Sequence, residues 1–383
     1  MDERGDGRLR VLGVTGTRAE FGLLAPVFEA ISASAALELR VAAAGAHLLK
    51  PSETWREVAG RYEITARVEM QRAGETGWAA DMAALGRGVS GFATVIERER
   101  PGWVLVLGDR IEAYAAASAA AVGGVRVAHL HGGDRAEGVA DEAMRHAITK
   151  LAHLHLPATA GSAERIVRMG EAAERVEVVG SPAACGIEEV EARLADGVDE
   201  RVRAIVQMHP CGLEAGEERA WSRAVVDGVL GAMGEDERAV VLAPNRDPGH
   251  DVVRGELARA VGASDRLFML EHLPHGAFRS LVKWLGERGG SFVGNSSAGL
   301  IEAPMLGCAS VDVGPRQGGR ERPGSVGRVE ARQAGAVEAA VREARSRRVD
   351  AAAHPYGDGR TGERVARLLW ERRGAGVRKR NAY

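Results

Sequence analysis

Short apolar runs alternate with segments of helical periodicity through the first half of the chain. The segments Glu20–Ser32 and Ile111–Val122 have the length and composition of helices. Strands separated by helices indicate βαβ units and a parallel sheet, because parallel neighbours need a crossover connection. The predicted strands of this half are Arg8–Val14, Leu37–Ala44, Trp103–Leu107, Val125–Leu130, His153–Leu156 and Val176–Val179.

The same pattern restarts after Arg201. The charged stretch Glu188–Glu200 between the two series is predicted to form a helix and a connector. Two series of this kind predict an α/β fold with two Rossmann-like, doubly wound lobes and a central cleft. The predicted strands of the second series are Ala204–Gln207, Ala239–Ala243, Leu267–Leu270, Ser291–Val293 and Ser310–Val313.

These patterns divide the chain into two lobes and a tail. Residues 1–187 are predicted to form an N-terminal lobe, and residues 200–360 a C-terminal lobe. Residues 361–383 are predicted to form a helix that packs back toward the first lobe, followed by a frayed tail. Open α/β sheets bind ligands beyond the carboxyl ends of their strands, so the chemistry of the site is sought there.

Composition narrows the classes of partner. The 383 residues are 45% hydrophobic and carry a formal net charge of −2, so no overall positive field attracts nucleic acid. No apolar stretch approaches the roughly 20 residues that span a bilayer, so no membrane association is expected. The cysteines Cys185, Cys211 and Cys308 are scattered and form no CxxC pair, which favours a reducing cytoplasm over a disulfide framework.

Carboxylates follow two predicted elements of the first half. Asp109 comes directly after the strand Trp103–Leu107, and Asp141 and Glu142 open a helix in which Arg145 and His146 stand four residues later. Acids at these positions suit general acid/base chemistry. The alternative is ordinary helix capping or a favourable position near the helix dipole.

Histidines end another strand of the first half. His129 and His131 are two residues apart on the predicted strand and therefore share a face, and Asp134 follows two glycines later. A zinc site would need a third ligand at typical spacing, which the sequence lacks, so no metal is predicted. Hydrogen bonding to substrate or backbone and a satisfied role in the core both remain open for the two histidines.

Phosphate-binding features occur in both halves. Gly16 allows a tight turn after the first strand, and Arg18 could pair with a phosphate at the start of the next helix, although such a turn can also be purely structural. The second half has a more specific segment at Gly294–Pro304, where hydroxyls and backbone N–H groups suit a diphosphate and a carboxylate suits a ribose. The candidate binding residues of this half are Asn245, Asn295, Ser296, Ser297, Glu302, Arg316, Gln317 and Arg320, with His209 as a catalytic candidate.

These motifs resemble the UDP-N-acetylglucosamine 2-epimerase family, and most closely its hydrolysing branch. The similar segments are TGTRAEFGLL, VLVLGDRIEA, AHLHGGDRAEGVADEAMRHAITKLAHLHLPAT, VGNSSAGLIEAPMLG and VDVGPRQGGRERPGSV, in family order from residue 11 to about 326. The resemblance implies a glycosyltransferase-B type fold and a UDP-sugar substrate. It also implies a homodimer or homotetramer.

Carried over position by position, the resemblance assigns roles to several of the candidates. Asp109 and either Asp141 or Glu142 match the essential acids, His209 matches the histidine of the second lobe, and Arg18 matches the arginine on the phosphate side. Ser296, Ser297 and Glu302 match the nucleotide-binding segment.

This chain departs from the family pattern at several positions. His131 stands where some members have glutamate, and Asp134 where others have glutamate. Cys211-Gly212 replaces a Val-Thr pair, and Ser325 replaces a loop asparagine. These departures leave the acids in place but bear on the identity of the sugar.

The implied reaction is anti elimination of UDP to a 2-acetamidoglycal, followed by addition of water with reprotonation at C2 from the other face. Asp109, Asp141 or Glu142 would exchange the proton, and His131 or Asp134 would orient or relay it. The reaction needs neither metal nor nicotinamide, and the chain has no GxGxxG or P-loop motif. The alternatives are a non-hydrolysing epimerase, a UDP-sugar transferase of the same fold, and a sugar-nucleotide binder without activity.

Overall fold

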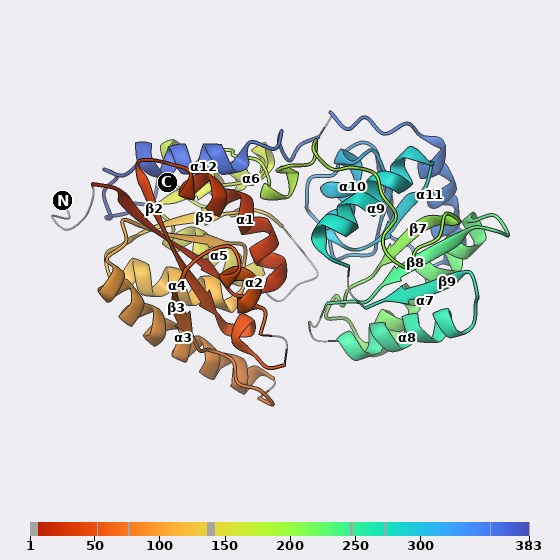
Figure 1. Cartoon of the computed structure of the whole chain (residues 1–383), viewed down its shortest axis with the longest axis horizontal. Helices are drawn as coiled ribbons and strands as arrows, with labels where there is room; N and C mark the ends of the chain where they lie inside the picture. Colours follow the sequence, from red (N-terminus) through yellow and green to blue (C-terminus); the bar gives the residue numbers. More distant parts are fainter. Residues whose placement is uncertain are drawn as a thin grey trace. The chain divides into compact units, whose positions relative to one another are not determined.

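The computed structural model describes every residue except 1–6, 52, 76, 136–141, 246, 248, 272, 353 and 383. The described residues form two compact units (Figure 1). The first comprises the described parts of residues 1–134, 141–185 and 356–383, and the second comprises Arg135 and the described parts of 186–355.

The first unit contains a six-stranded parallel sheet in the order β3-β2-β1-β4-β5-β6. This is the doubly wound Rossmann order, in which the direction of winding reverses between β1 and β4. The switch point places the residues after β1 and after β4 side by side. The strands are β1 (Leu9–Thr15), β2 (Leu37–Ala44), β3 (Ile64–Val68), β4 (Trp103–Leu107), β5 (Arg126–Leu130) and β6 (Leu154–Leu156).

Helices cover both faces of this sheet. Alternate residues of β4 point to opposite faces: Trp103 and Leu105 pack with α1 (Arg18–Ser32) and α12 (Thr361–Glu371), whereas Val104 and Val106 pack with helices on the other face. Every residue of β4 is therefore buried, which explains its continuous apolar run. The helices of the other face are α3 (Trp78–Glu99), α4 (Ile111–Val122) and α5 (Glu142–Leu151).

The smaller elements of the first unit complete its connections. They are the short helix α2 (Trp55–Ala59), helix α6 (Ala160–Arg168) and the 3-10 turns Gly45–Leu48, Ala173–Arg175 and Pro182–Ala184.

The second unit repeats the topology of the first. Its six parallel strands lie in the order β12-β11-β10-β7-β8-β9, which is the same doubly wound order with its switch point between β7 and β10. The two Rossmann-like α/β units confirm the predicted fold class. The strands are β7 (Val202–Gln207), β8 (Arg238–Leu242), β9 (Leu267–Leu270), β10 (Ser291–Gly294), β11 (Ala309–Val313) and β12 (Val326–Val329).

Helices also cover both faces of the second sheet. Helices α7 (Ala215–Ala232), α8 (His250–Gly262) and α11 (Ala334–Ser346) bury one face. Helices α9 (His275–Glu287) and α10 (Glu302–Met305), together with the segment 187–198, bury the other. The 3-10 turn Ser297–Gly299 precedes α10.

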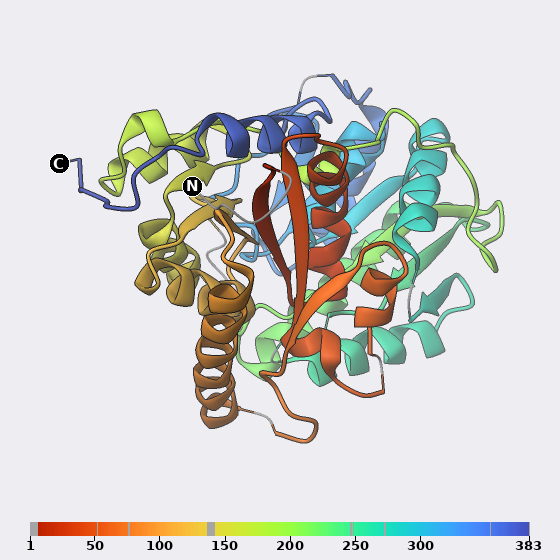
Figure 2. The same cartoon turned by 60° about the vertical axis from the view of Figure 1, so that its left-hand side comes forward.

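The C-terminal helix α12 packs on the first unit, although it follows the second unit in the sequence. It lies beside α1, as the blue and red helices in Figure 2 show. Val365 and Leu369 of α12 are buried, and Nε1 of Trp103 donates to the backbone oxygen of Leu369 at 2.9 Å. Gly362 allows the close approach, since a Cβ there would lie 2.6 Å from the backbone oxygen of Pro26.

Two predicted elements are wrong. The segment Val176–Val179 forms one isolated bridge, from Val176 to His155 of the edge strand β6, and no strand. The segment Glu188–Glu200 contains no helix. Its apolar residues, among them Val190 and Val198, instead pack in an irregular conformation against the core of the second unit.

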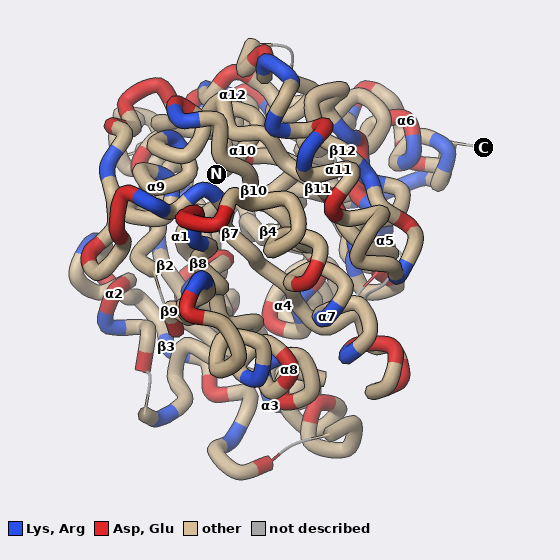
Figure 3. The backbone as a smooth tube through the Cα atoms, turned by 90° about the vertical axis from the view of Figure 1, so that its right-hand side faces the viewer, with Lys and Arg blue, Asp and Glu red and all other residues tan. Residues whose placement is uncertain are grey.

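Charged residues are distributed over both units. Lys and Arg alternate with Asp and Glu along the chain, in agreement with the small net charge (Figure 3). Among the described residues, no helix is long and apolar enough to cross a membrane.

Candidate functional site

The acid that follows β4 is held by a buried cation from α5. Asp109 and Arg145 form an ion pair, and the Arg145 side chain is 3% exposed. A second nitrogen of Arg145 donates to the backbone oxygen of Asp134 at 3.1 Å. The carboxylate of Asp109 thus lies beside a buried cation at the end of β4.

Of the two acids predicted to open α5, Glu142 lies within the described residues and pairs as expected. Glu142 begins α5 and its carboxylate lies 3.4 Å from Nε2 of His146, which agrees with the predicted spacing of four residues. Asp141 lies outside the described residues. Arg145, which was expected to face Asp141, pairs with Asp109 as described above.

His131 and Asp134 form one hydrogen-bonded cluster with two serines. Nδ1 of His131 lies 2.8 Å from Oδ2 of Asp134, and Nε2 lies 3.1 Å from the hydroxyl of Ser181. The other Asp134 oxygen accepts from the hydroxyl of Ser162 on α6 at 2.8 Å. His131, Asp134 and Ser181 are all buried, so this arrangement is fixed by the protein itself.

The prediction that His129 and His131 share a strand face is wrong. Strand β5 ends at Leu130, and His131 has a φ of +59°, so the alternation of a strand does not extend to it. Nε2 of His129 lies 2.8 Å from the backbone oxygen of Gly108, and burial lowers the pKa of His129 to about 3. His129 is therefore a neutral core residue that joins the ends of β4 and β5.

The start of α1, which was predicted to bind an anion, contains a carboxyl group of the protein. The N–H of Gly16 donates to Oε2 of Glu20 at 2.6 Å. Burial, with a smaller contribution from the nearby Glu112 carboxylate, raises the pKa of Glu20 to about 8. Arg18 lies 3.1 Å from Glu57 and is partly exposed. The Gly16 N–H is thus already used within the protein.

The second unit brings most of its predicted residues into one network at its own switch point. The side chain of Asn295, after β10, accepts from the N–H of His209 at 2.7 Å and donates to the His209 oxygen at 2.8 Å. The backbone oxygen of Asn295 accepts from Gln317 at 2.8 Å and from Arg316 at 3.4 Å. The N–H of Asn245 donates to Nδ1 of His209 at 3.0 Å. These contacts join the ends of β7, β8, β10 and β11.

His209 is held in one neutral form. Burial lowers the pKa of His209 to about 3, and the charge of Arg316 contributes in the same direction. Because Nδ1 accepts a backbone N–H, the proton of the neutral ring lies on Nε2. His209 can therefore donate a hydrogen bond from Nε2, but it does not carry a positive charge near pH 7.

Several polar atoms of this network have unused hydrogen-bonding capacity. The side-chain oxygens Oδ1 of Asn245 and Oε1 of Gln317, and Oε1 of Gln207 at the end of β7, are buried and have no hydrogen-bond partner among the described residues. Buried polar atoms are normally satisfied by protein, water or ligand. Their concentration at one sheet edge therefore marks a place suited to a polar ligand.

Four predicted residues of the second unit remain: Ser296, Ser297, Glu302 and Arg320. The Ser296 hydroxyl accepts from the N–H of Ala298 at 3.4 Å and caps the 3-10 turn that Ser297 begins. Glu302 accepts from Nε of Arg279 at 2.9 Å and lies 2.8 Å from Nε2 of His275. Nε of Arg320 donates to the backbone oxygen of Arg135 at 3.1 Å, apart from the network around Asn295.

The carboxyl group of Glu302 stays ionised. Burial by itself would raise the pKa of Glu302, but its bonds to His275 and Arg279 have the larger combined effect and lower the pKa. These two partners were not found by sequence reasoning, because neither stands near Glu302 in the chain.

The substitution at Cys211 preserves the local structure. The N–H groups of Cys211 and Leu213 both donate to Oε1 of the buried Glu218, at 2.6 and 3.1 Å. Burial, with the charge of Glu218, raises the pKa of the Cys211 thiol to about 12. Cys211 is therefore a protonated structural thiol rather than a nucleophile.

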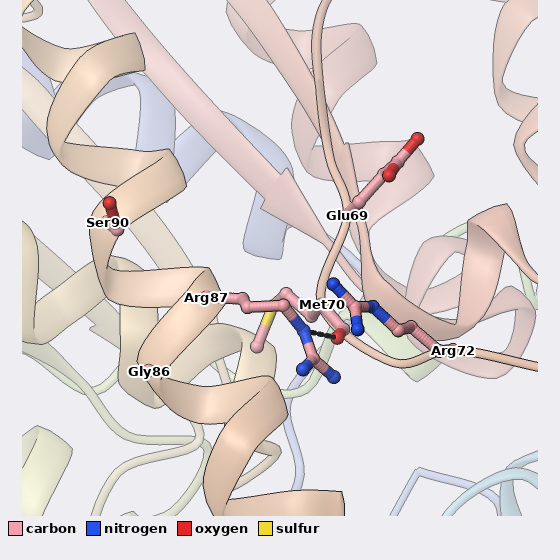
Figure 4. A pocket seen from close by; sticks show the side chains of 6 residues that line it. All are labelled: Glu69, Met70, Arg72, Gly86, Arg87 and Ser90. Carbon is pink, nitrogen blue, oxygen red and sulfur yellow. Dashed lines mark hydrogen bonds between the residues drawn. The ribbon is translucent and has the colours of Figure 1, made fainter. Parts of the chain in front are cut away.

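A cavity of about 440 Å³ lies elsewhere in the first unit, between the segment after β3 and helix α3. Figure 4 shows Arg87 of α3 donating to the backbone oxygen of Met70, 2.7 Å away, with Arg72 and Glu69 on the same segment as Met70. None of the predicted site residues lines this cavity. The candidate site residues are instead the cluster after β4 and β5 in the first unit and the network around Asn295 in the second.

The residues described do not include a group of three or more His, Cys, Asp or Glu that could hold a metal ion. Around Asp109 and His131 the first unit places carboxylates, a histidine and a guanidinium, which suit proton transfer. The second unit offers amides, hydroxyls and arginines, which suit an anionic, polar ligand.

Comparison with known proteins agrees with a sugar-nucleotide enzyme. Residues 29–370 match the family described as UDP-N-acetylglucosamine 2-epimerase, and the chain belongs to this family. A UDP-N,N'-diacetylbacillosamine 2-epimerase (hydrolyzing) of Legionella pneumophila is 32% identical over 370 residues, which cover 94% of this chain and 95% of the relative.

Two further similarities come from Neisseria meningitidis. A UDP-N-acetylglucosamine 2-epimerase of this organism is 32% identical over 327 residues, covering 83% of this chain and 82% of the relative. A crystal structure of a UDP-GlcNAc 2-epimerase bound to UDP-GlcNAc superimposes with a TM-score of 0.78 at 18% identity. It covers 95% of this chain and 100% of that one.

Proposed function

We propose that the chain is a hydrolysing 2-epimerase that converts a UDP-N-acetylhexosamine and water into UDP and the 2-epimeric free sugar. The candidate substrates are UDP-N-acetylglucosamine and a diacetamido analogue. The observation that carries the proposal is that the two sheets present different chemical groups at their carboxyl ends. Proton-transfer groups surround the switch point of the first sheet, and groups for a polar anion surround that of the second.

The hydrolysing outcome is supported by the relative from Legionella pneumophila. That relative is a hydrolysing 2-epimerase, and the similarity extends over nearly the full length of both chains. The substrate of that relative makes a diacetamido sugar a candidate for this chain.

The second unit would hold the nucleotide. Ser296, Ser297 and the arginines after β11 suit the diphosphate, and the ionised Glu302 suits the ribose hydroxyls. A firmly held UDP is a good leaving group, because cations and N–H groups stabilise the negative charge that develops as the C1–O bond stretches.

The first unit would move the proton at C2. As the C1–O bond breaks, positive charge at C1 makes the C2 hydrogen acidic, and the carboxylate of Asp109 accepts it. The products of this step are UDP and a 2-acetamidoglycal. Water then adds at C1, while a proton from a second acid, Glu142 or Asp141, reaches C2 from the other face. His131 and Asp134 orient the water or relay the proton.

One experiment tests this proposal. The purified protein is incubated in deuterated water with UDP-N-acetylglucosamine and, separately, with UDP-N,N'-diacetylbacillosamine, and the products are followed by NMR. Free UDP with a 2-epimeric sugar that carries deuterium at C2 is expected from at least one of them. A product without deuterium at C2 would exclude the mechanism.

The alternatives predict other products in the same experiment. A non-hydrolysing epimerase returns a UDP-linked 2-epimer that carries deuterium at C2. A transferase needs an acceptor and leaves C2 protonated. An inactive binder leaves both substrates unchanged. The variant Asp109→Asn is the matched control, because it removes the proposed base and keeps the nucleotide-binding unit intact.

A further inference from the structure

Ser181 bonds to the most constrained side chain of the candidate site. Its hydroxyl lies 3.1 Å from Nε2 of His131, and Nδ1 of the same ring lies 2.8 Å from Asp134. Ser181 is fully buried, so it cannot reach a substrate directly. No motif in the sequence singled it out, and the mechanism above does not use it.

The geometry determines which nitrogen of His131 carries the proton. A carboxylate only accepts hydrogen bonds, so Nδ1 of His131 is the donor to Asp134. In the neutral ring Nε2 is then an acceptor, and the hydroxyl of Ser181 donates to it. The Ser181 oxygen accepts from the N–H of Ala183 at 3.3 Å, which turns its own hydrogen toward the ring.

The partner of His131 on the other side is equally fixed. The second oxygen of Asp134 accepts from the hydroxyl of Ser162 at 2.8 Å. Ser162 in turn accepts from Thr159 at 3.0 Å and from Arg165 at 2.9 Å. The ring of His131 is therefore held between a carboxylate whose two oxygens are engaged and a hydroxyl whose orientation is set by the backbone.

Ser181 also lies where the chain passes between the two units. The chain leaves the first unit after Cys185 and returns to it at Tyr356. The N–H of Ser181 donates to the backbone oxygen of Tyr356 at 2.7 Å. Glycine is required on both sides of this contact. Gly180 has a φ of +85° and Gly357 a φ of +98°, and a Cβ on Gly357 would lie 2.9 Å from the Cα of Gly180.

We propose that Ser181 is a positioning residue for the reaction. Its hydroxyl donates to Nε2 of the His131 ring, whose Nδ1 donates to Asp134, and its backbone bonds to Tyr356, where the chain returns to the first unit. This inference rests on the proposed function for its kinetic part only. The tautomer of His131 is a property of the folded protein and can be measured without turnover.

The purely structural alternative is that Ser181 only caps the 3-10 turn Pro182–Ala184. The chain provides a matched control for that role. Ser34 in the first unit accepts from the N–H of Ala36 at 3.2 Å, the same i to i+2 geometry, and its hydroxyl has no part in the candidate site. Ser34→Ala therefore removes a comparable cap and nothing else.

The test compares the wild-type protein with Ser181→Ala, Ser181→Thr and Ser34→Ala. NMR of protein labelled with ¹⁵N in histidine, with His131 assigned through His131→Asn, is expected to show the Nδ1–H tautomer in the wild type. The Nε2 resonance should shift in Ser181→Ala and stay unchanged in Ser34→Ala. A wild-type ring protonated at Nε2, or an Nε2 resonance unaffected by Ser181→Ala, would overturn the proposal.

Kinetics supply the second readout. A misplaced proton-transfer group costs about 10²-fold, so Ser181→Ala should lower kcat by about that factor with KM and UDP affinity within about threefold. Ser181→Thr, which keeps the hydroxyl, should restore most of kcat. A kcat for Ser181→Ala equal to that of Ser34→Ala would contradict a positioning role. Absence of turnover in the wild type would count against the proposed function and leave the tautomer result standing.

Discussion

The carboxylate of Asp109 and the guanidinium of Arg145 form an ion pair that joins the end of β4 to helix α5. The same guanidinium donates to the backbone of Asp134, after β5. One buried cation therefore sets the position of an acid on one strand relative to a cluster on the next. Asp109 is the proposed base of the first unit, and this contact holds it at the end of β4.

Replacing Asp109 with asparagine tests this assignment. Asp109→Asn should lower kcat by about 10²–10⁴-fold, the usual contribution of general acid–base catalysis. UDP affinity, measured by calorimetry, should change less than about twofold, because the proposed nucleotide site belongs to the other unit. Asp81→Asn, at an exposed position of α3, is the control. Turnover of Asp109→Asn within threefold of wild type would rule out its role as base.

Glu302 should recognise the ribose of the nucleotide. A hydrogen bond to a charged group contributes about 1.5–3 kcal/mol, so Glu302→Gln should weaken UDP binding by about 10–100-fold. The sharper measurement uses 2'-deoxy-UDP. The wild type should bind it less tightly than UDP, whereas Glu302→Gln should discriminate little between the two. Equal discrimination by both proteins would show that Glu302 does not contact the 2'-hydroxyl. Glu287→Gln, exposed at the end of α9, serves as control.

Glu171 is predicted to stabilise the first unit in a pH-dependent way. It lies 2.6 Å from Lys150, 2.7 Å from Lys379 and 3.0 Å from His155, and it is 2% exposed. Burial by itself would raise the pKa of Glu171, but these three partners lower it to about 2. Glu171→Gln should cost about 3–5 kcal/mol near pH 7, as expected when one partner of a buried pair is removed.

The sign of the pH dependence follows from the lowered pKa of Glu171. Its contribution is complete above the ordinary value of 4.5 and is lost as the pH falls toward 2. In urea unfolding, the difference between wild type and Glu171→Gln should therefore be smaller at pH 3 than at pH 7. Glu363→Gln removes an exposed pair with Arg360 and should cost at most about 1 kcal/mol. A difference independent of pH would disprove the lowered pKa.

Glu20 should make the stability depend on pH with the opposite sign to Glu171. Its pKa is raised to about 8, so the native protein retains a proton that the unfolded chain releases above pH 4.5. Rising pH therefore favours unfolding between about 4.5 and 8. Glu20→Gln should be less sensitive to pH over this range and gain stability relative to wild type at pH 8. Glu29→Gln, exposed on the same helix, should follow the wild-type curve.

Sequence reasoning found most strands because buried parallel strands are continuous apolar runs. Leu37–Ala44, Trp103–Leu107 and Leu267–Leu270 agree with the structure residue for residue. It missed the outermost strands β3 (Ile64–Val68) and β12 (Val326–Val329). Each of these contains charged or glycine residues that weaken the apolar signal, whereas the edge strand Leu267–Leu270 is wholly apolar.

The sequence predicted which residues follow the strands at the candidate site, but not the contacts that these residues make. Asp109, His131 and Asn295 were found because they follow apolar runs. Ser181 and Arg145 received no role at the site, since their partners stand 50 and 36 residues away in the chain and no local pattern records such distances. The roles of the site residues and the dimeric or tetrameric state remain predictions.

The hydrogen bond from Trp103 to Leu369 has a consequence for protein synthesis. The two residues are 266 positions apart, and the whole second unit is translated between them. Val365, Leu368 and Leu369 of α12 complete an apolar cluster whose buried residues outside this helix have all been made by residue 179. When synthesis has reached residue 355, the second unit is complete, whereas the first unit still lacks the helix that covers part of its apolar core. The first unit is therefore closed by a helix that is translated after the whole second unit.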